Sequence, residues 1–144
     1  MFSLQGMNAL VTGASGGIGR ALCDALAAAG CARIYAGSRS GEGPQGPKFV
    51  RFSVDLEDED SIRAAAETMQ ADPPEWVIAA TGVLTLAGGI GPERTYKRLD
   101  PGAMARVFAI NTIGPALIAF TRMRSLPRPR ASASRSGAPM PPRS

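Results

Sequence analysis

The stretch that decides the fold is VTGASGGIGRAL, residues 11–22, in which a glycine-rich turn separates an apolar run from a helical pattern. Gly13, Gly17 and Gly19 have the spacing G-x-x-x-G-x-G. Glycine lets the chain turn sharply, lets the backbone approach a phosphate group, and lets the helix pack closely on the strand. The first turn of that helix would offer free N–H groups and a positive dipole to an anion.

This turn has two interpretations. In the first it binds a phosphate, and the hydroxyl groups of Thr12 and Ser15 could add contacts. In the second it is a structural glycine-rich connection with no ligand. The setting between a strand and a helix, within the first 20 residues, favours the binding interpretation.

Strand and helix patterns alternate on both sides of the turn. Short apolar or alternating runs predict four strands, at residues 8–12, 32–38, 48–54 and 75–80. Helices are predicted after the glycine turn, near Asp58, and over about 101–120. The first of these would end at Gly30 and bury a stripe made of Ile18, Ala21, Leu22, Ala25, Leu26 and Ala29. This order predicts an α/β fold with a parallel sheet and helices on both faces.

Composition is typical of a single soluble domain, with 44% hydrophobic and 19% charged residues in a chain of 144. There is no uninterrupted run of roughly 18 apolar residues, so we expect no membrane span. The N-terminus lacks the pattern of a signal peptide, and we expect a cytoplasmic protein. The chain has no histidine, and Cys23 and Cys31 lack metal-ligand spacing. Free thiols that are buried or half-buried are therefore expected, and no metal site.

The net charge of +4 is concentrated at one end of the chain. Residues 121–144 contain six arginines and no acidic residue, whereas residues 1–120 carry a net charge of −2. The same segment holds five prolines and five serines but few large apolar side chains, which predicts disorder. We therefore expect an ordered domain over 1–120 and a basic Pro/Arg/Ser-rich tail over 121–144.

These motifs resemble the short-chain dehydrogenase/reductase family over nearly all of residues 3–120. The family's T-G-x-x-x-G-x-G corresponds to residues 12–19, and its acid after the third strand corresponds to Asp55. Its N-N-A-G motif is similar to AATG at 79–82, and its active-site asparagine segment is similar to INTIGP, with Asn111 at the matching position. Residues 83–117 are also similar to the C-factor-like branch.

The resemblance implies the N-terminal half of a doubly wound parallel-sheet (Rossmann) fold. It also implies an oxidoreductase that binds a nicotinamide dinucleotide, with Leu56 beside the adenine ring. The residues that would contact this cofactor are Thr12, Gly13, Ser15, Gly17, Ile18, Gly19, Arg39, Asp55, Leu56, Ala80 and Gly82.

Three of the candidate residues have simpler explanations. Asp55 could cap the following acidic helix, although Asp58 is better placed to do so. Asn111 lies on or near an apolar helix face and could bond to neighbouring backbone without taking part in chemistry. Arg39 could be an ordinary solvated charge. However, the second strand ends in AGSRS with no acid, and an arginine there can bind a 2′-phosphate, so NADP(H) is favoured over NAD(H).

The catalytic group of the family is a tyrosine with a lysine four residues later, helped by a serine. A phenol with a pKa of about 10 is a poor acid or base at neutral pH without such a partner. Here Tyr35 is followed four residues later by Arg39, and Tyr96 by Asp100. Lys97 directly follows Tyr96 in an expected loop, so we reject that pair. Catalysis is therefore expected to be incomplete, and a truncated or frameshifted gene is our leading account of the tail.

Two classes of function remain open at this point. The first is a dinucleotide-binding portion of an oxidoreductase that is inactive by itself and self-associates through its unpaired fourth strand and last helix. The second is an interaction protein whose arginine-rich tail contacts nucleic acid or an acidic partner by charge. The tail has no aromatic residue for stacking on bases, which makes nucleic acid the weaker hypothesis.

Overall fold

The computed structural model describes residues 3–86, 95, 97 and 99–125, and its centre is a parallel sheet. The strands are β1 (Asn8–Thr12), β2 (Arg33–Ser38), β3 (Phe49–Ser53) and β4 (Trp76–Ala79), in the spatial order β3-β2-β1-β4. Each neighbouring pair is parallel, and Leu10 of β1 lies opposite Tyr35 on one side and Val77 on the other. The α/β fold class is confirmed, and each observed strand ends within one residue of its expected bounds.

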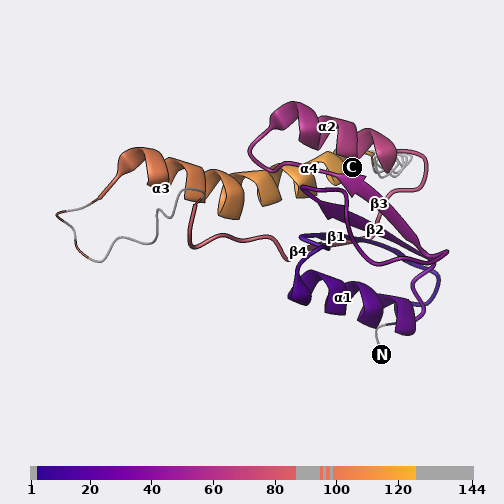
Figure 1. Cartoon of the computed structure of the whole chain (residues 1–144). Coiled ribbons are helices and arrows are strands. Elements are labelled where there is room, and N and C mark those ends of the chain that lie inside the picture. Colours follow the sequence, from indigo (N-terminus) through magenta and orange to yellow (C-terminus); the bar gives the residue numbers. More distant parts are fainter. Residues whose placement is uncertain (1–2, 87–94, 96, 98, 126–144) are drawn as a thin grey trace, which may run out of the picture.

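Helices cover both faces of this sheet (Figure 1). Helix α1 (Gly17–Ala28) lies on one face, and α2 (Glu59–Thr68) and α4 (Gly114–Ser125) lie on the other. Alternate strand residues point to opposite faces, as the pleat requires. One core therefore includes Ala9, Val11, Ile34 and Ala36 with Cys23 and Leu26 of α1. The second includes Leu10 and Tyr35 with Ile62, Ala65, Met69 and Ile118.

The buried face of α1 differs from the expected stripe. Gly19, Cys23 and Leu26 are buried, whereas Ile18 is 75% exposed and the alanines at 21, 25 and 29 are also exposed. An alanine adds so little apolar area that it does not determine which face a helix buries, and the thiol of Cys23 acts as a small apolar group. Both cysteines are free and buried, as expected.

The last helix is longer and less regular than expected. Helix α3 (Pro101–Phe108) continues through a π-helical turn (Ala109–Ile113) into α4, which ends at Ser125. Asp100 begins it, because its side chain accepts a hydrogen bond from the Ala103 N–H. The expected boundary at Phe120 thus lies inside α4, and the expected tail from residue 126 onward lies outside the described residues.

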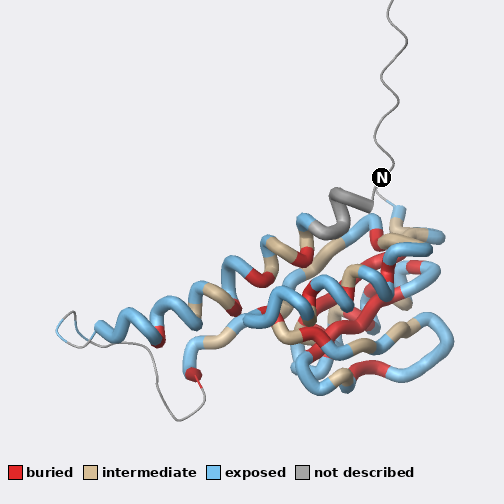
Figure 2. Tube along the Cα trace, turned by 90° about the horizontal axis from the view of Figure 1, so that it is seen from above, coloured by how far each residue is buried: buried red, intermediate tan, exposed pale blue. Residues whose placement is uncertain are grey.

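Helix α3 projects away from the sheet, and most of it is exposed (Figure 2). Phe108 is 56% exposed and Ile113 54% exposed, although Ile110 and Ile118 are buried. Among the described residues, the stretch Pro101–Phe120 is long and apolar enough to cross a membrane, with a mean hydropathy of 1.5; core helices of soluble proteins also meet this criterion. It is not an uninterrupted apolar run, because Arg106 and Asn111 lie within it.

Candidate functional site

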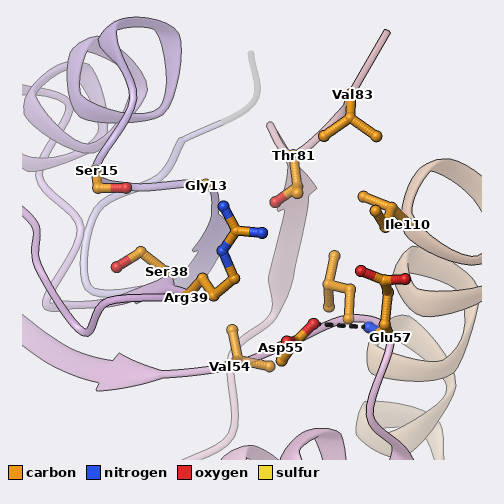
Figure 3. Close-up of a pocket in the computed structure, with 11 residues that line it drawn as sticks. Gly13, Ser15, Ser38, Arg39, Val54, Asp55, Glu57, Thr81, Val83 and Ile110 are labelled. Carbon is orange, nitrogen blue, oxygen red and sulfur yellow. Dashed lines mark hydrogen bonds between the residues drawn. The ribbon is translucent and has the colours of Figure 1, made fainter. Parts of the chain in front are cut away.

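The segments that follow the four strands meet at the carboxyl edge of the sheet and enclose a cavity of about 160 Å³ (Figure 3). Crevices at this edge are where doubly wound sheets bind ligands. Five sequence-predicted residues line it: Gly13, Ser15, Arg39, Asp55 and Leu56. Six lining residues were missed by sequence reasoning: Ser38, Val54, Glu57, Thr81, Val83 and Ile110. All six are next in sequence to a predicted site residue, and that adjacency is the signal that could have found them.

The three glycines of the G-x-x-x-G-x-G motif have different roles. Gly13 has a φ of +78°, and a Cβ there would lie 2.7 Å from the carbonyl oxygen of Ala80. A Cβ at Gly19 would collide with the carbonyl of Gly13. Gly17 is different, because a Cβ at that position would meet no described atom within 4 Å. Packing therefore requires the first and third glycines, while the second leaves open space above the turn.

The N-terminus of α1 is open to an anion. Its N-cap is Gly16, which supplies no side-chain hydrogen bond, and its first turn contains no acidic residue. Helices α2 and α3 both begin instead at aspartates, Asp58 and Asp100, whose carboxylates accept backbone hydrogen bonds. The helix that follows β1 thus keeps the unpaired N–H groups and the positive dipole that attract phosphate.

The two hydroxyl side chains beside this turn, those of Ser15 and Thr12, differ in their exposure. Ser15 is exposed and lines the cavity, so its hydroxyl is available to a ligand. Thr12 is fully buried in β1, and its Oγ1 has no hydrogen-bond partner among the described residues. Thr12 does not line the cavity, and its expected hydroxyl contact with a phosphate stays a prediction. The side chain of a strand residue next to a turn can point either into the core or toward the turn. The sequence does not show which of the two directions it takes.

Arg39 extends from the end of β2 into the cavity (Figure 3). Within the described part of the chain, its guanidinium makes no ion pair or side-chain hydrogen bond; its carbonyl accepts one from Ser53 Oγ at 2.9 Å. The group therefore presents an unneutralised positive charge and several N–H donors to whatever enters the cavity.

Asp55 does not cap α2. That position belongs to Asp58, whose Oδ1 accepts the Asp60 N–H at 2.9 Å. Asp55 is half-buried, and its Oδ1 accepts the Glu57 N–H at 3.0 Å (Figure 3). Its own N–H donates to Ser61 Oγ at 2.9 Å. The carboxylate is thereby held at the cavity wall with a second oxygen that is engaged by no other described group.

Leu56 and Glu57 join this wall to the last helix. Leu56 is only 7% exposed and packs in the core beneath α2 and α4, so its contact with a ligand is limited. Glu57 Oε1 accepts a hydrogen bond from Arg106 Nε at 3.1 Å. This hydrogen bond, followed by the charge of the carboxylate, raises the pKa of Arg106 above its ordinary value.

Asn111 makes the backbone contact that its simpler interpretation describes. Its Oδ1 accepts the Val83 N–H and its Nδ2 donates to the Val83 carbonyl, both at 2.8 Å. The residue lies in the π turn and is exposed, although the sequence places it on or near an apolar helix face. The paired bonds fasten the loop after β4, including Gly82, to the last helix. Ala80 is half-buried above Gly13, and neither it nor Gly82 lines the cavity.

Neither tyrosine is placed in this cavity by the described structure. Tyr35 is 2% exposed in the core, and its hydroxyl donates to the carbonyl of Asp72 at 2.7 Å. Asp72 lies just before β4, at the opposite edge of the sheet from the cavity. Tyr96 lies outside the described residues.

Comparison with known proteins agrees with this geometry. The sequence profile described as short chain dehydrogenase matches residues 7–133. The chain is 30% identical over 133 residues to the short chain dehydrogenase pigC of Monascus ruber, and 29% identical over 116 residues to nodulation protein G of Rhizobium sp. (strain N33). These alignments cover 80% and 77% of this chain but 41% and 45% of the relatives. The chain thus spans less than half the length of these curated relatives.

Solved structures show the same fold. A short chain dehydrogenase from Burkholderia cenocepacia, determined in complex with NADP, superposes with a TM-score of 0.68 at 23% identity and covers 86% of this chain and 50% of that one. A short-chain type dehydrogenase/reductase from Mycobacterium marinum gives a TM-score of 0.72 at 22% identity, covering 85% and 51%. In both cases the similarity extends over about half of the solved chain.

Proposed function

Because the chain belongs to the short chain dehydrogenase family, we propose that residues 1–120 form the NADP(H)-binding portion of an oxidoreductase. The observation that carries this proposal is the open space at Gly17, next to a helix N-terminus without a side-chain cap. Packing within the described chain gives no reason for a glycine there, whereas a pyrophosphate that approaches the backbone does. The NADP complex of the Burkholderia cenocepacia relative supports the same ligand.

The residues present fit one end of such a dinucleotide. Backbone N–H groups of the turn and the exposed hydroxyl of Ser15 would hold phosphate. The second oxygen of Asp55 would accept a hydrogen bond from an amino group of the base. A cavity of about 160 Å³ is smaller than a site for a whole dinucleotide, and so we assign it to the adenosine and pyrophosphate half.

The preference for NADP(H) over NAD(H) follows from the end of β2. An acid there would hydrogen-bond the ribose 2′-hydroxyl and repel a 2′-phosphate. This chain instead has Ser38 and Arg39, and the guanidinium in the cavity is not neutralised by any described residue. An arginine can neutralise a 2′-phosphate and donate two hydrogen bonds to it.

Hydride transfer would be supplied by the nicotinamide when it is bound. The accompanying proton needs a group at the substrate oxygen, and these 144 residues contain no Y-x-x-x-K motif. We therefore assign nucleotide binding, but not catalytic turnover, to this chain. We also propose that the protein is cytoplasmic. Ile110 and Ile118 of the apolar helix pack in the cores of the domain.

Titration calorimetry of the purified chain with NADPH and NADH tests the proposal. We expect weak binding with NADPH preferred, loss of binding in Gly17→Val, and a shift of preference toward NADH in Arg39→Asp. Ala21→Val, which adds the same kind of bulk to an exposed position of α1, is the matched control and should bind normally. Folded protein that binds neither nucleotide would refute the proposal, and steady NADPH oxidation with added carbonyl compounds would refute the assignment of binding alone.

A further inference from the structure

The ion pair between Glu57 and Arg106 connects a loop that lines the cavity to the helix that projects from the sheet. Glu57 belongs to the loop between β3 and α2 and lines the cavity, whereas Arg106 lies in the projecting helix α3. The Glu57 side chain is 27% exposed and that of Arg106 is 52% exposed. A pair this exposed stabilises a fold very little, because water screens it. Its position at the wall suggests a local effect instead.

A backbone hydrogen bond links Glu57, and with it the ion pair to Arg106, to the carboxylate of Asp55. The backbone N–H of Glu57 donates to Asp55 Oδ1 at 3.0 Å, so the orientation of that carboxylate depends on where the Glu57 main chain lies. Arg106 holds the side chain of the same residue. Arg106, Glu57 and Asp55 therefore form a series of contacts that runs from α3 to the cavity.

A second contact fixes the same loop nearby. A Cβ at Gly114, the first residue of α4, would lie 2.5 Å from both the Cβ and the carbonyl oxygen of Leu56. The loop therefore touches the helix on both sides of the π turn, through Glu57 before it and through Leu56 after it. Ile110 lies between these two contacts and lines the cavity.

We infer that Arg106 is a positioning residue for nucleotide binding, acting through Glu57 to hold the Asp55 carboxylate toward the base. This inference rests on the proposed function. Removal of the arginine would also leave the negative charge of Glu57 unpaired beside that of Asp55. Two unneutralised carboxylates at the wall would repel the phosphates of a ligand.

The test measures NADPH affinity and amide hydrogen exchange in the full chain. In Arg106→Gln we expect faster exchange at the Glu57 N–H, affinity weaker by about threefold to tenfold, and an unchanged melting temperature. Arg106→Lys keeps the charge and should recover part of the affinity. Glu57→Gln tests the same link from the other partner and should also speed the exchange of its own N–H.

The matched control is another exposed ion pair, Arg63 with Asp60, whose Nη1 and Oδ1 atoms are 2.6 Å apart on α2. Arg63→Gln should leave both the exchange at Glu57 and the affinity unchanged. If the unmodified chain binds NADPH and Arg106→Gln binds it equally well, the positioning role is overturned but the proposed function is not. The same holds if Arg63→Gln loses as much affinity for NADPH as Arg106→Gln does. Wild-type protein that binds no nucleotide would overturn the proposed function first, and the positioning role with it. An unchanged exchange rate at Glu57 refutes the link without any ligand.

Discussion

At the residue scale, the same amino acid has different physical roles within one turn. Gly13 needs its positive φ and its closeness to Ala80, and Gly19 needs its closeness to Gly13. Gly17 needs neither. Substitution should therefore separate folding from binding inside a motif of eight residues.

Gly19→Ala should destabilise the fold by about 3 kcal/mol or more, because its Cβ would be forced into backbone atoms that cannot move aside. Gly17→Ala should keep the stability of the unmodified chain or slightly increase it, because alanine favours the helix and meets nothing. Urea unfolding of the two variants measures the difference. Equal stability of both would contradict the packing described for the turn.

We expect the ionisation of Cys23 to reduce the stability of the fold at high pH. Burial, followed by the charge of Asp24, raises the pKa of its thiol from 9.0 to about 11. The pKa of this thiol is higher in the folded state than in the unfolded state. The neutral thiol therefore contributes fully to the stability of the fold below pH 9, and this contribution is lost progressively as the pH rises toward 11. The expected loss is roughly 2 to 3 kcal/mol. Cys23→Ala should show a smaller decline over the same pH range in denaturant titrations, and an identical decline would show that other groups cause it.

At the element scale, the last helix does more than cover the sheet. Its π turn carries Asn111, which holds the loop after β4, and the segments on either side of the turn hold the loop after β3. π turns inside α-helices are frequent at functional sites. One helix thus sets the separation of two walls of the cavity.

Asn111→Ala should destabilise the chain by about 1 to 2 kcal/mol, because the Val83 N–H and carbonyl lose both of their partners. Hydrogen exchange at the Val83 N–H should become faster. Thr112→Ala, an exposed neighbour in the same turn, is the control and should change neither quantity. Normal exchange at Val83 in Asn111→Ala would show that the loop is held by other contacts.

At the scale of the whole molecule, the described part of the chain leaves two surfaces for association. The outer edge of β4 has no described strand beside it, and edges of this kind pair readily with other chains. The last helix exposes Met104 and Phe108 in α3, Ile113 in the π turn and Phe120 in α4. Exposed apolar groups along one helix favour contact with a second molecule. We therefore retain the expectation that the protein self-associates.

Sedimentation over a range of concentrations should show oligomers of the unmodified chain. Phe108→Lys should shift the distribution toward monomer, because a charge would be buried in any contact that uses this helix. Ala21→Lys places the same charge on the exposed side of α1 and should not shift it. A monomer at every concentration would contradict self-association.

The sequence by itself determined the order and type of the elements, the glycine turn, and the positions of Arg39 and Asp55 just after strands. These features follow from local rules, namely side-chain periodicity and the conformational freedom of glycine. The family is confirmed by comparison, whereas the similarity to the C-factor-like branch and the preference for NADP(H) stay predictions.

Only the tertiary structure decided which side of each element faces inward and which distant residues meet. It placed Thr12 in the core, exposed Ile18, paired Asn111 with Val83, and joined Glu57 to Arg106. The last pair is separated by 49 residues, and no periodicity within either segment signals the other. Such contacts depend on how the helices pack on the sheet, where small differences in buried area choose one helix face over another.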